Sequence, residues 1–169
     1  SDCIRKAAEF TGFQEQYGRS RRSPPSGPLR RGIGIGVSAY FGGSLIYPNS
    51  SSVIIKMSED GAATLFTGAL DIGQGAETIL SQIVAEELKI PVEEIRVIAA
   101  DTETTPVDIG SWISGNAYVT GNAARVAATG IRRKLLALAA AELKIVPEQL
   151  SMEGKRVFIT AAPNRGFTY

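Results

Sequence analysis

Residues 71–75, Asp-Ile-Gly-Gln-Gly, stand between an expected strand and an expected helix and carry a clear chemical signal. Gly73 and Gly75 lie where the helix begins, and the first N–H groups of a helix have no partner inside it. Such groups attract anions, and glycines let a phosphate or a flat ring come close. Gln74 can donate and accept hydrogen bonds, which suits a heterocycle with oxo and amino groups. A tight turn with Gln74 facing water fits equally well, so spacing alone leaves both interpretations open.

A second segment of this kind, residues 110–116, precedes a longer helical stretch. Ser114 or Asn116 is expected to cap that helix, because short polar side chains accept hydrogen bonds from first-turn N–H groups. With Ser111, the same residues could instead offer hydroxyl and N–H donors to an anion. Capping accounts for the residue types by itself. The ligand interpretation is favoured if the two helices are neighbours, because both helix starts could then converge on one ligand.

The titratable residues indicate no catalytic group. The sequence has no histidine and one cysteine, Cys3, which excludes Ser-His-Asp triads, histidine-ligated metals and a four-cysteine cluster within this chain. No pair of carboxylates has a spacing typical of general acid–base chemistry. We therefore predict no catalytic residue and no protein metal ligand here.

The sequence pattern Gly34-x-Gly36-x-x-Ala39 matches the dinucleotide-binding fingerprint. That fingerprint needs a strand before the glycines and a helix after them. Here a segment rich in proline and arginine precedes the glycines, and no helical pattern follows. We favour glycines in a strand that another backbone approaches closely. A nucleotide-binding oxidoreductase is retained as a minor alternative, which a shift of melting temperature by NAD would reveal.

Hydrophobic periodicity predicts the elements that position these loops. An Asp60-Gly61 turn joins two of the strands into a hairpin. Helices are expected over residues 3–10, 76–89 and 118–144, and strands over residues 32–40, 53–57, 63–67, 94–100, 149–152 and, as the last, 156–160.

Residues 87–95 and 142–150 resemble each other, since each ends a helix, turns through a proline and starts an apolar run. This duplicated helix–turn–strand unit predicts an α+β fold: a two-layer domain whose mixed or antiparallel sheet is covered on one face by two main helices. Gly121 and Gly130 each weaken the longer helix by roughly 1 kcal/mol relative to alanine. Their presence therefore indicates close packing against a neighbour.

Length and composition indicate an ordinary globular chain of 169 residues with net charge +1. We expect an N-terminal helix and a Pro/Arg-rich linker over residues 1–30, followed by one domain over residues 31–169.

The basic residues near the start favour a solvated tail or subunit surface over a nucleic-acid site, because no stacking aromatics lie among them. No apolar run approaches 18 residues, so no membrane contact is expected. The single cysteine favours a cytoplasmic location.

Taken in order, the motifs resemble the large subunit of the xanthine oxidase family of molybdenum hydroxylases. The matching pieces are residues 71–75 with the helix after them, 88–91, Asp101-Thr102 with Pro106, Gly110-Ser111 with Ser114, and 121–124. The ordered set extends over residues 31–145 and is more specific than any one piece. Within the family, residues 112–116 look most like those of 4-hydroxybenzoyl-CoA reductase.

The resemblance implies a molybdenum–molybdopterin cofactor, in the cytosine dinucleotide form, held by several glycine-rich loops. The family glutamine that matches Gln74 lies beside the cofactor, and the serine that matches Ser114 contacts its phosphate region. With the helix starts described above, the expected cofactor-binding set is Gly73, Gln74, Gly75, Ser111, Ser114 and Asn116. Ile113 is expected to border the substrate, and Tyr40 and Phe41 are weaker candidates for packing against it.

The family's catalytic base is a glutamate in a Gly-Glu motif well C-terminal of this region, and Glu153-Gly154 does not match it because a hairpin turn is expected there. We therefore expect the chain to be an internal fragment, inactive and without cofactor alone. Its expected partners are the remaining segments of the large subunit, iron–sulfur clusters and FAD on other subunits or domains, and a small aromatic or acyl-CoA substrate. The alternative is a non-enzymatic truncated paralogue that serves as a binding or assembly module. The downstream coding sequence distinguishes the two.

Overall fold

The computed structural model describes residues 2–22, 27–28, 32–38, 50–112 and 114–169. The chain divides into two compact units, Ser1–Tyr40 and Phe41–Tyr169. The expected boundary between residues 30 and 31 lies among residues that are not described, so it stays a prediction.

The first unit contains two helices, α1 (Asp2–Phe10) and α2 (Phe13–Arg22). The first was expected, but α2 extends into residues 18–22, which the proline-rich composition had assigned to the linker. Residues 32–38 form no strand, so the expectation of a strand there is wrong over the part described. A Cβ added at Gly34 or Gly36 would meet nothing within 4 Å. Within the described ranges, no other backbone approaches these glycines, and no partner strand supports their alternation with apolar residues.

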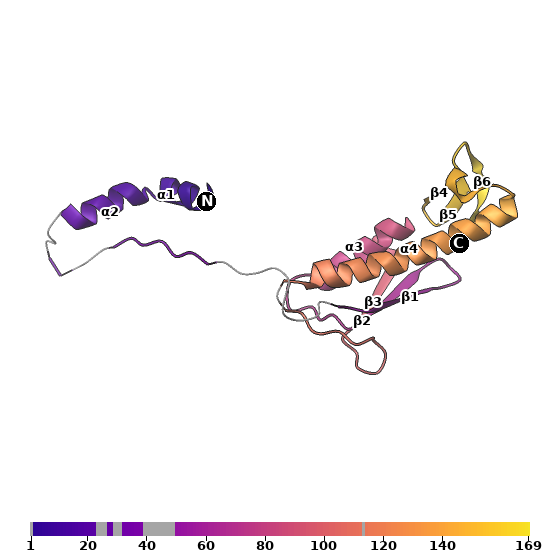
Figure 1. The fold of residues 1–169 in the computed structure, drawn as a ribbon, viewed down its shortest axis with the longest axis horizontal. Helices are drawn as coiled ribbons and strands as arrows, with labels where there is room; N and C mark the ends of the chain where they lie inside the picture. The colour runs from indigo at the N-terminus through magenta and orange to yellow at the C-terminus, as the bar shows by residue number, and fades with distance from the viewer. Residues whose placement is uncertain (1, 23–26, 29–31, 39–49, 113) are drawn as a thin grey trace. The chain divides into compact units, whose positions relative to one another are not determined.

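The second unit begins with a three-stranded sheet in the order β1 (Val53–Met57), β2 (Ala63–Thr67) and β3 (Ile95–Ala99) (Figure 1). The expected hairpin joins β1 to β2, and its turn uses Gly61 at a φ of 78°. Strands β2 and β3 are parallel because the helix α3 (Ala76–Leu88) crosses over between them.

Helices α3 and α4 (Asn116–Leu143) cover one face of this sheet (Figure 1). Their shared core is built on Leu65, Leu80, Val84 and Leu88, each at most 2% exposed. A Cβ on Gly121 would lie 2.9 Å from Ile83 Cδ1, which confirms the close packing expected there. Gly130 has nothing within 4 Å of such a Cβ, so the same prediction for Gly130 is wrong.

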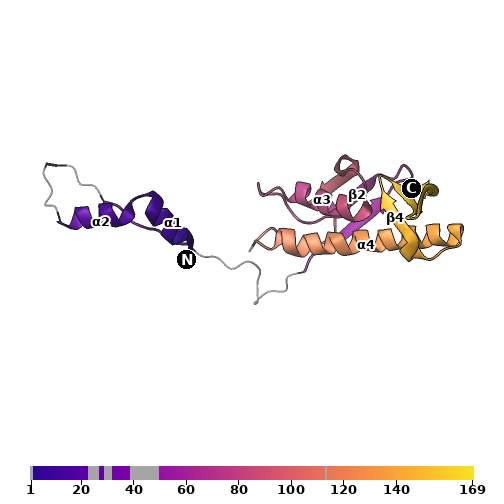
Figure 2. The same ribbon diagram turned by 90° about the horizontal axis from the view of Figure 1, so that it is seen from above.

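A second sheet, β4 (Leu150–Glu153), β5 (Arg156–Ile159) and β6 (Ala162–Thr168), packs on the C-terminal half of α4 (Figure 2). The α+β class is confirmed, but the two strands of the duplicated unit lie in different sheets. Helix α3 has 13 residues and α4 has 28, so α4 is about 20 Å longer at 1.5 Å per residue and carries β4 beyond the first sheet. Strand β6 was not expected, because it includes Pro163 and Gly166 and shows no alternation.

The repeat itself is visible in the backbone. Lys89 and Lys144 each follow their helix at φ 56° and ψ 44°. A short 3-10 turn then leads into each strand, η1 (Val92–Glu94) before β3 and η2 (Pro147–Gln149) before β4. The same local geometry thus serves two different sheets.

Tyr169 joins the two halves of the second unit. Its Oη donates to the Leu88 carbonyl at 2.6 Å, and its backbone N–H donates to the Lys155 carbonyl at 3.0 Å. The side chain packs against both apolar clusters. Burial raises the pKa of the Tyr169 phenol to about 12, and the charge of Glu153 adds to this.

Replacing Tyr169 with phenylalanine is expected to lower the free energy of unfolding by about 1 kcal/mol through the lost hydrogen bond. Because the folded-state pKa lies above the ordinary tyrosine value of 10.0, the folded state holds the phenolic proton more tightly than the unfolded chain does. The wild-type chain therefore loses this stability as pH rises from 10 towards 12, and the variant does not. Denaturant unfolding between neutral and alkaline pH measures both effects. Parallel pH profiles of the two proteins would contradict this assignment.

Candidate functional site

Two loops meet at one end of the second unit. Because β2 and β3 are parallel, their carboxyl ends lie at the same edge of the sheet, where α/β sites commonly form. The loop after β2 covers residues 68–75, and the loop after β3 covers residues 100–112 and 114–115. Together these residues are called the loop end.

The peptide of Leu70 links the two loops. Ser111 Oγ accepts from the Leu70 N–H at 3.1 Å and donates to the Leu70 carbonyl. Asn116 Nδ2 donates to Ser111 Oγ at 2.9 Å, and Gln74 Nε2 donates to the Leu70 carbonyl at 3.1 Å. Three residues singled out from the sequence, Gln74, Ser111 and Asn116, therefore belong to one hydrogen-bond network.

Gln74 is exposed, but its side chain is held against its own loop. Its Oε1 accepts from the Ile72 N–H at 2.7 Å while Nε2 contacts the Leu70 carbonyl. An amide group has two N–H bonds and two acceptor lone pairs. One of each remains for a ligand, and the orientation of the amide is fixed before any ligand arrives.

The turn before α3 is held by a carboxylate of the chain itself. Asp71 Oδ1 accepts from the Gly73 N–H at 2.8 Å and the Gly75 N–H at 3.3 Å. These bonds lower the pKa of Asp71, the Gly73 N–H most. Gly73 and Gly75 have φ of 105° and 76°, a region that glycine adopts without strain. The N–H groups expected to await an anion here are thus already used by Asp71.

Replacing Asp71 with asparagine is expected to make the free energy of unfolding less dependent on pH at acid pH. Since the folded-state pKa is below the ordinary aspartate value of 3.8, the stabilisation is complete above that value and is lost as pH falls through the folded-state pKa. The amide cannot gain or lose this proton, so its contribution stays constant. Denaturant unfolding of both proteins from neutral pH down to about pH 2 makes the comparison. Superimposable profiles would show that Asp71 does not hold this turn.

The start of α4, like that of α3, has no side-chain cap. Its N-cap is Gly115, which makes no side-chain cap bond, so the expected cap from Ser114 or Asn116 is wrong. Ser114 precedes the cap at a φ of 51°, and its side chain is exposed. Asn116 Oδ1 is buried without a hydrogen-bond partner in the part of the chain that the structure describes. This helix start therefore offers N–H donors and one acceptor that a ligand could use.

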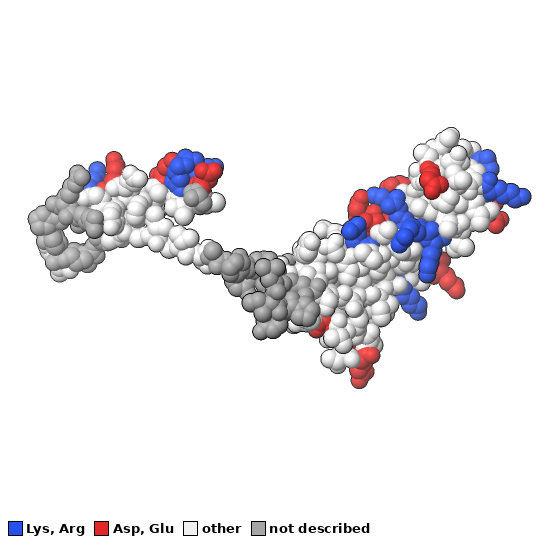
Figure 3. Space-filling model, viewed as in Figure 1, with Lys and Arg blue, Asp and Glu red and all other residues white. Residues whose placement is uncertain are grey.

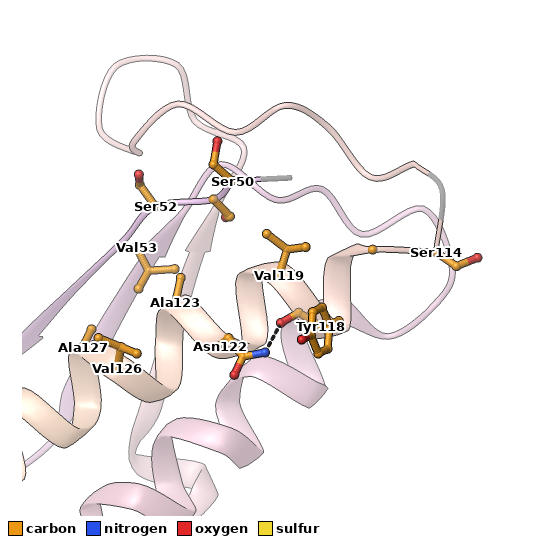
Figure 4. Close-up of a pocket in the computed structure, with 12 residues that line it drawn as sticks. Ser50, Ser52, Val53, Ser114, Tyr118, Val119, Asn122, Ala123, Val126 and Ala127 are labelled. Atoms are coloured by element: carbon orange, nitrogen blue, oxygen red, sulfur yellow. Dashed lines mark hydrogen bonds between the residues drawn. The ribbon is translucent and has the colours of Figure 1, made fainter. Parts of the chain in front are cut away.

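An open groove of about 1010 Å³ runs from Ser114 along α4. Figure 4 shows Tyr118, Asn122 and Val126 on the α4 side, opposite the residues that lead into β1. Sequence reasoning gave no role to Tyr118 or Asn122. Tyr118 and Asn122 are four residues apart within α4, and this spacing could have identified them as a pair, because residues four apart share one helix face.

The second unit exposes both charged and apolar side chains. Figure 3 shows basic and acidic side chains together over the helices, where Arg132 and Glu87 pair at 3.9 Å. The loop end exposes apolar side chains, with Ile72 at 67% and Val107 at 88% exposed, together with the acidic residues Asp101 and Glu103. Exposed apolar side chains mark a surface that another protein or a ligand covers where they form one contiguous patch.

Tyr40, Phe41 and Ile113 lie outside the described residues. Within the described ranges, no group of three or more Cys, Asp or Glu side chains could hold a metal ion. Of the described helices, none has the length and apolar character needed to span a bilayer.

Comparisons with known proteins agree on one family. The model of the molybdopterin cofactor-binding domain matches residues 4–169. The xanthine dehydrogenase molybdenum-binding subunit of Escherichia coli O157:H7 is 36% identical over 146 residues, which cover 84% of this chain and 19% of that protein. The 6-hydroxypseudooxynicotine dehydrogenase complex subunit gamma of Paenarthrobacter nicotinovorans is 36% identical over 147 residues, covering 87% of this chain and 18% of that protein.

A solved structure, reconstituted CO dehydrogenase from Oligotropha carboxidovorans, superposes with a TM-score of 0.65 at 30% identity, covering 70% of this chain and 15% of that chain. The chain thus spans less than a fifth of the length of each of these proteins.

Proposed function

The chain belongs to the molybdopterin cofactor-binding domain family of xanthine oxidase-type enzymes, and from this membership we propose that its loop end forms part of the cradle for that cofactor in a molybdenum-dependent dehydrogenase. The observation that carries the proposal is the network through Leu70, which brings Gln74 and the open start of α4 together.

The residues present fit such a group. Molybdopterin combines a phosphate with a flat ring that bears amino and N–H groups. The first turn of α4 has no side-chain cap, which suits the phosphate. Asn116 Oδ1 is a buried acceptor without a partner among the described residues. A Cβ on Gly73 or Gly75 would meet no described residue within 4 Å, so the described part of the chain leaves space in front of that turn.

We assign separate roles to the contacts. The free N–H and acceptor of Gln74 bind the ring side of the cofactor, and the Ser114 hydroxyl with the first N–H groups of α4 binds the phosphate. Gly73 and Gly75 keep side chains away from the ring. When bound, the cofactor supplies the redox chemistry. The residues of this chain bind it, orient it and, with the apolar side chains of the loop end, exclude water.

The proposal extends to partners and to the form of the cofactor. The exposed apolar side chains of the loop end favour coverage by the remaining segments of a larger subunit. Following the family pattern, we propose the cytosine dinucleotide form, with iron–sulfur clusters and FAD on partner subunits or domains. The substrate proposal, reductive removal of the ring hydroxyl from 4-hydroxybenzoyl-CoA, rests on the resemblance of residues 112–116. Two relatives are named as dehydrogenases of other compounds, namely xanthine and 6-hydroxypseudooxynicotine.

The test uses the whole protein encoded by the gene, produced with its neighbouring subunits in molybdate-supplied cells. We expect about one molybdenum per large subunit, and release of cytidine monophosphate on acid hydrolysis. Turnover is then measured with 4-hydroxybenzoyl-CoA and a reduced dye, and with xanthine and an oxidised dye. A folded whole protein without molybdenum would overturn the proposal and favour the assembly-module alternative. Turnover of xanthine but not of 4-hydroxybenzoyl-CoA would overturn only the proposal for the substrate. The 169-residue chain by itself is expected to bind no molybdenum.

A further inference from the structure

Ser111 has no hydrogen-bonding capacity left for a ligand. A serine hydroxyl donates one hydrogen bond and accepts two. Ser111 Oγ donates to the Leu70 carbonyl, accepts from the Leu70 N–H at 3.1 Å and accepts from Asn116 Nδ2 at 2.9 Å. All of its capacity is used within the chain.

The groups that Ser111 joins are those proposed to touch the cofactor. The Leu70 carbonyl also accepts from Gln74 Nε2 at 3.1 Å, so it sets the direction of the Gln74 amide. Asn116 is the first residue of α4. Ser111 and Leu70 are 41 residues apart in sequence. One hydroxyl therefore fixes where Gln74 lies relative to the open helix start.

The position of Ser111 is in turn held from the opposite side. Asp108 Oδ1 accepts from the Gly110 N–H at 2.8 Å, and Asp108 Oδ2 accepts from Ser51 Oγ at 2.6 Å. Ser51 also forms a β-bridge with Asp108. The loop that carries Ser111 is thus attached to the entry of β1, which is part of the first sheet's framework.

We propose that Ser111 is a positioning residue, which sets the spacing between Gln74 and the first turn of α4 without touching the cofactor itself. This inference rests on the proposed function and gives Ser111 a different role from the direct cofactor contact predicted from the sequence. If Ser111 were a direct contact, its removal would weaken cofactor binding and leave the cofactor-free loops unchanged. A positioning role requires the cofactor-free loops to change.

The test compares Ser111→Ala and Ser111→Thr in the whole protein, with Ser151→Ala as the matched control. Ser151 bonds Thr160 Oγ1 at 2.8 Å in the second sheet, far along the chain from the loop end. Amide hydrogen exchange is measured on cofactor-free protein over a peptide containing residues 68–75, and molybdenum content on protein produced with molybdate. We expect Ser111→Ala to speed exchange at the Leu70 amide by about tenfold and to lower molybdenum content by half or more. Threonine is expected to restore both, and the control to change neither.

Unchanged exchange in Ser111→Ala would overturn the positioning role, whether or not molybdenum is lost. Faster exchange with full molybdenum content would also overturn it, because the spacing would then not matter to the cofactor. Absence of molybdenum from the wild-type whole protein defeats the proposed function and, with it, the role of Ser111 towards the cofactor. In that case the exchange result still decides whether Ser111 holds the two loops together.

Discussion

Replacing Ser114 with aspartate is expected to remove most of the bound molybdenum cofactor from the whole protein while leaving the cofactor-free protein as stable as before or slightly more so. Ser114 precedes the N-cap of α4 at a φ of 51°, and aspartate tolerates this left-handed region better than most residues. A carboxylate near a helix start interacts favourably with the helix dipole by about 0.3–1 kcal/mol. Stability and cofactor retention should therefore change in opposite directions.

The loss of cofactor follows from charge. A carboxylate about 4 Å from a phosphate, at an effective dielectric constant of about 20, costs about 4 kcal/mol, which corresponds to roughly a thousandfold weaker binding. Ser114→Asn is the matched control, because the asparagine side chain has the same shape as that of aspartate without its charge. Molybdenum per subunit after gel filtration and the melting temperature of cofactor-free protein are the two measurements. Full molybdenum content in Ser114→Asp would show that the phosphate lies elsewhere.

Replacing Gly68 with alanine is expected to lower the free energy of unfolding by about 2–3 kcal/mol, as overpacking does in well-packed sites. The added Cβ would lie 2.4 Å from the Pro106 carbonyl oxygen and 2.9 Å from the Asp108 backbone nitrogen. Backbone atoms cannot rotate away, so the segment from Pro106 to Asp108 must shift. Asp108 holds the loop of Ser111 to Ser51, and the shift should therefore reduce cofactor retention as well.

Gly130→Ala is the matched control for Gly68→Ala. A Cβ at Gly130 meets nothing within 4 Å, and alanine is favoured over glycine inside a helix by about 1 kcal/mol. This control should therefore gain stability. Denaturant unfolding of the three proteins under one set of conditions gives the comparison. Equal stability of the two variants would contradict the close approach of residues 106–108 to Gly68, which directly follows β2.

Local patterns predicted most of the second unit. The Asp60-Gly61 turn between alternating strands placed β1 and β2 at their observed bounds, and the apolar stripe of α3 gave a helix within one residue at its end. These signals succeed because each depends on neighbours in sequence. The alternation in residues 32–38 failed for the same reason, since a strand also needs a partner that local sequence does not reveal.

The sequence identified some residues of the candidate site, but neither Tyr118 and Asn122 of the groove nor the contacts inside the site. Gln74, Ser111 and Asn116 were singled out, and the structure brings them together. The bonding of Asp71 to the turn before α3 depends on the backbone turn at Gly73 and Gly75. The use of the Ser111 hydroxyl by Leu70 depends on a contact 41 residues away. Neither residue spacing nor residue type contains that information.

The length of α4 has a consequence for the order of folding. Its N-terminal half packs in the core of the first sheet through Ala124 and Ala128, and its C-terminal half packs in the second through Ala139 and Ala140. The second sheet joins consecutive strands, whereas the loop end is closed by bonds between distant residues. Contacts between residues that are distant in sequence form late in folding and open early in unfolding, because closing a long loop costs more conformational entropy than closing a short one. We therefore expect the loop end, which is proposed above to receive the cofactor, to close after the hairpins of the second sheet, leaving an interval during maturation when a bulky organic group can enter.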